Sequence, residues 1–201
     1  MIAIAHLVAV ISPGPDFALI VRQTVKFNRK VAIVSSIGIA FGILIHITYC
    51  ILGVGYLLSS NEVLYKLFKY TCSLYLFYLG FRSLFQSKII NSNVDNGFIS
   101  KKNKYNYLNA FKQGFLTNVL NIKATLFFLS LYSIINIETP KLIQLFYGFW
   151  MCAITGIWFT LVSVFFTSKI FITYISRYNI ILNKIMGVVL IYIAGKIFLY
   201  Y

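Results

Sequence analysis

Two groups of polar residues interrupt the apolar runs of this 201-residue sequence. The first is Ser12-Pro13-Gly14-Pro15-Asp16, and the second consists of Asn118, Asn121 and Lys123. Asp16 offers a carboxylate, Lys123 an ammonium, and the two asparagines offer amides that both donate and accept hydrogen bonds. Together these groups could bind a small ligand that carries a positive and a negative charge, and Asp16 could also carry a proton.

The first group predicts a broken helix. Pro13 and Pro15 lack the N–H that an α-helix needs, and Gly14 between them permits unusual backbone dihedrals. Proline is favoured as the first residue of a helix, so Pro15 would restart it and place Asp16 in the first turn, where the helix dipole favours a carboxylate. A purely structural kink explains the prolines but not an acid inside an apolar run, which is costly and usually functional. We therefore expect Ser12, Pro13, Gly14 and Pro15 to form the break and Asp16 to bind substrate or a coupling ion.

The second group has functional and structural interpretations. Asn118 and Asn121 could contact a charged substrate, or they could supply the interhelical hydrogen bonds that asparagine often makes in membranes. Lys123 could take part in binding, or it could pair statically with Asp16. Both alternatives stay open at this point.

His46 is a further candidate, as a proton relay. It lies on one helical face with Gly38 and Gly42, at a spacing of four residues. Glycines at this spacing are typical of a seam where helices pack closely. His6 is a weaker candidate for the same role.

The composition indicates a polytopic membrane protein. Sixty per cent of the residues are hydrophobic, 11% are charged and the mean hydropathy is +0.83, whereas soluble domains are about 25% charged. The net charge of +14 would suggest nucleic acid in a soluble protein. Here the basic residues lie at the edges of apolar runs, so we expect a lipid bilayer and no nucleic acid.

Neither a metal site nor an enzyme active site is predicted. Cys50, Cys72 and Cys152 lie in apolar stretches without the spacing of metal ligands. The four acids and two scattered histidines do not supply a nucleophile with its base or a cluster of carboxylates. We expect no cofactor, no metal and no enzymatic activity.

A membrane-spanning helix needs about 20 apolar residues, and the sequence contains six such runs. The first begins at Met1, is interrupted at 12–16 and ends near the basic residues at 22–30. The others cover about 31–58, 63–85, 111–135, 141–167 and 179–200. A polar segment at 86–110 and short connections around 138–140 and 176–178 separate the later runs. A five-span topology would follow if the short first run did not cross the membrane.

The order of these runs predicts an internal repeat. The segment LYLFYLGFRSLF at 74–85 is similar to VLIYIAGKIFLY at 189–200, with Gly80 matching Gly195. Each closes a set of three spans that opens with a polar interruption, and an odd number of spans inverts the second set. Helices 1 and 4 would then be interrupted near the membrane midplane, as in transporters built from inverted repeats. The predicted fold is one all-α transmembrane domain, 1–201, with repeat 1 at about 1–85, a connector at 86–110 and repeat 2 at about 111–201.

The distribution of lysine and arginine predicts the orientation, because cytoplasmic loops are enriched in both. One face of the six-span arrangement has thirteen basic residues and the opposite face has four. Both termini should therefore lie outside, with the 86–110 connector in the cytoplasm.

Four segments resemble a known family. They are SPGPDF, GIAFGILIHITYCILGVG, YLGFRSLF and GFLTNVLNIKATLFFLSLY, and their order resembles that of the LysE/RhtB amino-acid exporters over about residues 5–200. The resemblance implies a multi-pass protein of the bacterial cytoplasmic (inner) membrane that exports amino acids or close derivatives, driven by protons. The family usually has proline between Asn121 and Lys123, where this chain has Ile122. The resemblance thus leaves open whether helix 4 is fully broken.

Two other functions are compatible with the composition. A divalent-cation exporter of similar plan would need several oxygen ligands at the midplane, where Asp16 is the one acid. A membrane scaffold without transport activity would leave Asp16 and Lys123 unexplained. The amino acid transported, the coupling stoichiometry and the presence of a homo-oligomer are left open.

Overall fold

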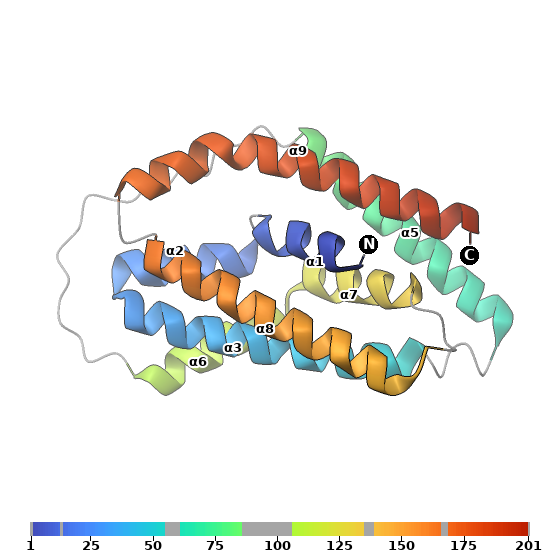
Figure 1. Cartoon of the computed structure of the whole chain (residues 1–201), viewed down its shortest axis with the longest axis horizontal. Coiled ribbons are helices and arrows are strands. Elements are labelled where there is room, and N and C mark those ends of the chain that lie inside the picture. Colours follow the sequence, from blue (N-terminus) through green and yellow to red (C-terminus); the bar gives the residue numbers. More distant parts are fainter. Residues whose placement is uncertain are drawn as a thin grey trace.

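A computed structural model of the chain describes residues 2–12, 14–54, 61–85, 106–134, 139–165 and 169–200. Every regular element in these ranges is helical (Figure 1). The helices are α1 (Ile2–Ile11), α2 (Pro15–Lys26), α3 (Arg29–Tyr49) with its π-helical extension η1 (Cys50–Val54), α5 (Glu62–Phe85), α6 (Tyr107–Val119), α7 (Ile122–Ile134), α8 (Lys141–Phe165) and α9 (Lys169–Tyr200).

Two helices of the described residues are long and apolar enough to cross a membrane: α3 continued through η1 to Gly53, and α8. Two bent pairs pass the same test when each pair is taken as one span: α1 with α2, bent by 48°, and α6 with α7, bent by 56°. The described residues are therefore all-helical, with two to four candidate membrane spans. α5 has 24 residues and α9 has 32, so at 1.5 Å per residue they are about 36 and 48 Å long.

Both predicted helix breaks are present. α1 ends at Ile11 and α2 begins at Pro15, with Gly14 as its N-cap, while Pro13 lies outside the described residues. The second break falls at Leu120 and Asn121, between α6 and α7. The fourth predicted span is therefore interrupted, although this chain has Ile122 where the family usually has proline.

Small residues let the helices of the two predicted repeats approach closely. α3 packs along α6 and α8, and α5 packs along α9. A Cβ on Gly114 of α6 would overlap the carbonyl oxygen of Ser35 in α3, and one on Gly38 would overlap that of Phe111. A Cβ on Gly42 would lie 2.6 Å from Asn118 Oδ1. The predicted glycine seam on α3 is confirmed, and its partner is α6.

Hydrogen bonds from serine hydroxyls join the same helix pairs, α3 with α6 and α5 with α9. Ser35 donates to the carbonyl of Ala110 at 2.7 Å, and Ser73 and Ser83 of α5 donate to Ala194 and Asn183 of α9 at 2.8 and 2.6 Å. These bonds satisfy buried polar groups where no water is available, as membrane-embedded helices require.

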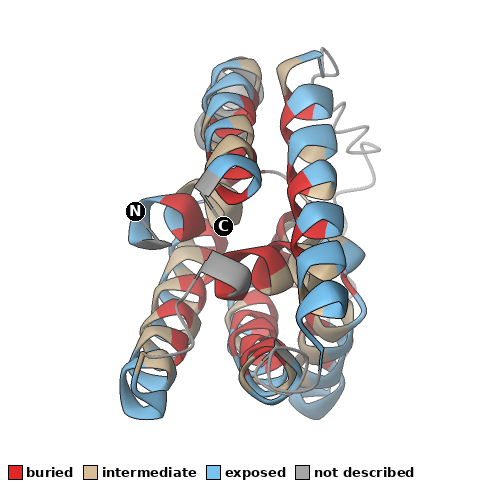
Figure 2. Ribbon diagram, turned by 90° about the vertical axis from the view of Figure 1, so that its right-hand side faces the viewer, coloured by how far each residue is buried: buried red, intermediate tan, exposed pale blue. Residues whose placement is uncertain are grey.

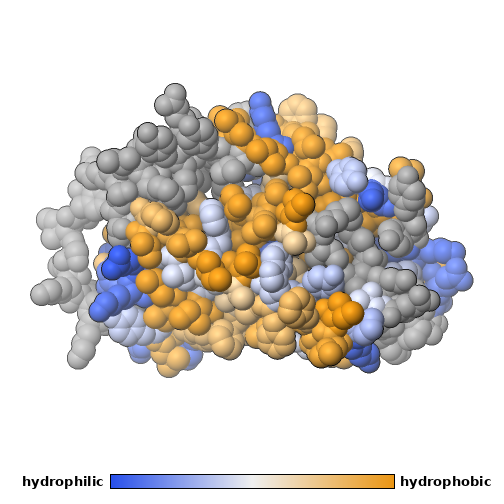
Figure 3. Space-filling model, in the orientation of Figure 1, coloured by the Kyte–Doolittle hydropathy of each residue, from blue (hydrophilic) through white to orange (hydrophobic). Residues whose placement is uncertain are grey.

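The exterior is apolar in the middle and polar towards the ends. Seen end-on, buried faces turn inward and exposed faces outward (Figure 2). Large apolar side chains cover the middle of the face drawn in Figure 3, and those exposed on the surface include Ile37, Phe41, Ile45, Phe77, Phe81, Phe149 and Leu161. Because a soluble surface would not expose so many, this surface fits a hydrocarbon environment.

The structure corrects two predicted boundaries. The connection expected at 176–178 is wrong, because α9 runs without a break from Lys169 to Tyr200. Three polar residues without glycine or proline do not interrupt a helix. α6 begins at Tyr107, so the last residues of the expected 86–110 connector are helical; Asn106 caps them by accepting from Leu108 N at 2.9 Å. Residues 86–105 of the connector lie outside the described residues.

Candidate functional site

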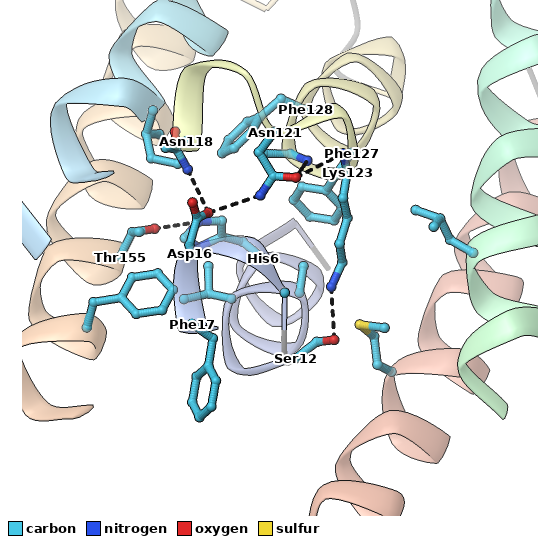
Figure 4. A pocket seen from close by; sticks show the side chains of 18 of the residues that line it. His6, Ser12, Asp16, Phe17, Asn118, Asn121, Lys123, Phe127, Phe128 and Thr155 are labelled. Carbon is cyan, nitrogen blue, oxygen red and sulfur yellow. Dashed lines mark hydrogen bonds between the residues drawn. The ribbon is translucent and has the colours of Figure 1, made fainter. Parts of the chain in front are cut away.

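A cavity of about 60 Å³ lies where the two helix breaks meet (Figure 4). α1, α2, α6, α7 and α8 supply polar side chains to its lining, and α3, α5 and α9 add apolar ones. The polar and charged lining residues are His6, Ser12, Asp16, Asn118, Asn121, Lys123 and Thr155. The structure therefore brings the two predicted polar groups together, although about a hundred residues separate them.

Asp16 is held by the second break. Its Oδ2 accepts the side-chain amides of Asn118 at 2.9 Å and Asn121 at 3.2 Å. Its Oδ1 is buried and has no partner in the protein. The carboxylate is thus oriented through one oxygen and keeps the other available for a ligand.

The asparagines hold the second break as well as Asp16. Asn121 is the N-cap of α7, because its Oδ1 accepts from Lys123 N at 3.1 Å and Ala124 N at 3.4 Å. This cap starts a new helix at Ile122 without a proline. Asn118 lies in the last turn of α6 and packs against Gly42 of α3. Both residues thus make interhelical hydrogen bonds, one of the two interpretations that the sequence left open, with Asp16 as their acceptor.

Lys123 reaches across to the first break. Its Nζ donates to Ser12 Oγ at 2.9 Å, and a Cβ on Gly14 would lie 3.8 Å from it. Lys123 and Asp16 do not form an ion pair in the structure. The alternative of a static pair between them is therefore wrong for this conformation.

His46 lies behind the cavity and does not line it. Its Nε2 lies 3.0 Å from the carbonyl oxygen of Asn118, and its Nδ1 contacts the hydroxyl of Tyr49. Since a carbonyl can only accept, Nε2 carries the proton in this bond. The ring also stacks on Phe128, 5.5 Å between centroids. The structure thus gives His46 a positioning contact with the end of α6.

Sequence reasoning underrated His6 and missed Thr155. His6 is fully buried, and its Nε2 lies 3.2 Å from Thr155 Oγ1. Helical spacing could have indicated His6, because it shares the lining with Ala9 and Val10, three and four residues later. Thr155 lies in an apolar helix and gave no signal. Of the predicted break residues, Ser12 and Gly14 line the cavity, whereas Pro15 is exposed.

The N-cap of α7 leads to a stability prediction. Asn121→Ala should lower the free energy of unfolding by about 1 kcal/mol more than Asn121→Ser, because serine keeps a capping oxygen and alanine does not. Both variants lose the amide that donates to Asp16, so the difference isolates the cap. Unfolding of the purified protein by increasing SDS measures it, and equal stabilities would contradict the capping role.

Comparison with known proteins agrees with this arrangement of breaks and charges. The family model described as LysE type translocator matches residues 7–201. The chain belongs to the LysE type translocator family. It is accordingly a multi-pass membrane transporter and not an enzyme, and the predicted resemblance is confirmed.

Several relatives of this LysE type translocator are bacterial. The threonine efflux protein of Escherichia coli (strain K12) is 28% identical over 173 residues, which cover 82% of this chain and 80% of that protein. An uncharacterized membrane protein of Haemophilus influenzae is 24% identical over 192 residues, covering 94% and 90%. The membrane protein YrhP of Bacillus subtilis is 30% identical over 127 residues, covering 61% and 60%. No solved structure matches the chain.

Proposed function

We propose that this LysE type translocator exports amino acids or close derivatives across the bacterial cytoplasmic membrane, driven by protons. The observation that carries the proposal is the pair of opposite charges in one cavity. Asp16 and Lys123 both line it, they are not ion-paired, and Asp16 Oδ1 has no protein partner. An amino-acid zwitterion carries an ammonium and a carboxylate, and in a low-dielectric cavity each of these charges needs a partner of opposite charge or a hydrogen bond. The threonine efflux relatives support this class of substrate.

In this proposal Asp16 Oδ1 binds the substrate ammonium or, in its absence, the coupling proton. Lys123 Nζ binds the substrate carboxylate beside the start of α2. That helix terminus has Gly14 as N-cap and no side-chain cap, so its positive end favours an anion there. The sequence left open whether Asn118 and Asn121 contact a charged substrate, and in the structure their amides donate to Asp16. We therefore assign them to orienting Asp16, and His46 to orienting Asn118.

We also propose six spans in two inverted repeats, about 1–85 and 111–201, as parts of one transmembrane domain. α1/α2, α3 and α5 form the first set, and α6/α7, α8 and α9 form the second. Contacts of α2 with α6, α3 with α8 and α5 with α9 support this, because they pair each span of the first set with its counterpart in the second. The basic end of α2 and the starts of α3 and α6 lie at the left-hand end in Figure 1. We place this end in the cytoplasm.

Two alternatives are less well supported. A divalent-cation exporter would need several oxygen ligands, and Asp16 is the one acid among the described residues that line the cavity. A scaffold without transport activity would not explain why two opposite charges line one cavity without forming an ion pair. Assembly into a homo-oligomer is compatible with the proposal and is not required by it.

The test is transport by purified protein in lipid vesicles. Vesicles loaded with one labelled amino acid at a time, across a panel, should release at least one of them faster when a pH gradient is imposed. Protein-free vesicles are the control, and vesicles loaded with Mn²⁺ test the cation alternative. Movement of Mn²⁺ without movement of any amino acid would contradict the proposal.

A further inference from the structure

His6 and Thr155 form a polar pair in the cavity that the roles proposed above leave unused. Both residues line the cavity, and His6 is fully buried. Thr155 Oγ1 lies 3.2 Å from His6 Nε2. The other ring nitrogen, Nδ1, is buried and has no hydrogen-bond partner in the protein.

The His6 ring is fixed in place by its neighbours. Trp150 meets it edge-on with 5.7 Å between centroids, and Phe128 lies 6.1 Å away. Thr155 holds it from α8 (Figure 4). A ring fixed on three sides presents Nδ1 in one direction, which is what a binding group requires.

The rest of the lining is mostly apolar. It includes Ala9, Val10, Phe127, Phe159, Met186 and Leu190. With Asp16 and Lys123 assigned to the charged ends of an amino acid, two lining residues keep a buried polar atom without a partner, His6 at Nδ1 and Asn118 at Oδ1. Because Oδ1 of Asn118 lies against Gly42 of α3, we assign Nδ1 of His6 to the substrate's side chain. A ligand that leaves such an atom without a hydrogen bond binds about tenfold more weakly, or worse, than one that meets it.

We propose that His6 determines specificity by hydrogen-bonding a polar group on the side chain of the transported amino acid, with Thr155 as its positioning residue. This inference rests on the proposed function. If Thr155 donates to Nε2, then Nδ1 carries a proton and donates; if Nε2 donates to Thr155, then Nδ1 accepts. A hydroxyl both donates and accepts, so it fits either tautomer of the histidine.

Threonine and valine are the probes, because they differ by a hydroxyl in place of a methyl group. We expect wild-type protein in vesicles to transport threonine at least tenfold faster than valine. His6→Phe keeps an aromatic ring but no hydrogen-bonding group, so it should bring the ratio close to one. His6→Asn keeps a polar group near the position of Nδ1 and should retain most of the preference.

The matched control is Ser73→Ala, which removes a buried hydroxyl whose bond to Ala194 lies outside the cavity. It should leave the threonine-to-valine ratio unchanged. If His6→Phe does not reach the membrane, Thr155→Val is the second variant, and it should lower the ratio because the ring loses its hydrogen-bond partner.

A purely structural role of His6 would slow both amino acids equally and keep the ratio. An unchanged ratio in these variants, or a wild-type ratio near one, would overturn the inference and leave the proposed function standing. Failure of the wild type to transport any amino acid would instead overturn the proposed function itself.

Discussion

Asp16→Asn should reduce export at least a hundredfold while leaving the protein in the membrane at near-normal abundance. Asparagine has nearly the same shape, and its carbonyl oxygen can still accept the amides of Asn118 and Asn121 that hold Oδ2 in the wild type. What it lacks is the negative charge that the substrate ammonium or the proton needs. Leaving one member of a buried charge pair without its partner costs about 3–5 kcal/mol, which corresponds to a factor of a hundred or more in binding.

The double variant Asp16→Asn with Lys123→Met distinguishes a functional from a structural role of Asp16. If Asp16 only balanced the charge of Lys123, Asp16→Asn would lower abundance, and adding Lys123→Met would restore export. In the functional case the double variant stays inactive. Glu62→Gln is the matched control, because it makes the same chemical change at an exposed acid bound to Lys66 at the start of α5. Wild-type export by Asp16→Asn at normal abundance would refute the assignment.

Gly114→Ala should prevent stable folding. The added Cβ would overlap the backbone carbonyl of Ser35, and a backbone atom can move only if α3 moves away from α6. Separating these helices also breaks the bond from Ser35 to Ala110. We expect a loss of about 3 kcal/mol, at the upper end of the range for overpacked cores, seen as aggregation after detergent extraction and unfolding at lower SDS.

Gly195→Ala is the matched control for that experiment. A Cβ on Gly195 of α9 would meet nothing within 4 Å, and alanine favours a helix over glycine by up to about 1 kcal/mol. The same substitution should thus leave α9 unchanged or stabilise it. Normal extraction and unfolding of Gly114→Ala would show that α3 and α6 do not pack as described.

The sequence predicted the helix breaks and the residues around the cavity because local chemistry determines them. Within a helix, Pro15 fits only the first turn, and Asn121 is followed by the two N–H groups that it caps. Charged residues in apolar runs, such as Asp16 and Lys123, are costly against lipid, so in a membrane protein they usually face the interior of the helix bundle or a cavity. These features need no knowledge of distant contacts.

The hydrogen-bond partners could not be predicted in the same way. Whether Lys123 reaches Asp16 or Ser12 depends on how two helices cross, and both targets lie more than a hundred residues away in the sequence. The pairing of His6 with Thr155 depends in the same way on how α1 packs against α8. The long course of α9 was missed because polar residues at 176–178 resemble a loop by composition, while helix geometry tolerates them.

The two helix breaks differ in what maintains them. Proline lacks an N–H in every conformation of the protein, so the break before Pro15 is permanent. The break before Ile122 contains no proline and is maintained by bonds from Asn121, Asn118 and His46. Bonds of this kind can be exchanged for continuous helix when the carboxylate they hold changes its charge or its partner. The break in the second half of the molecule therefore depends on side-chain hydrogen bonds, including those to Asp16, whereas the break in the first half does not.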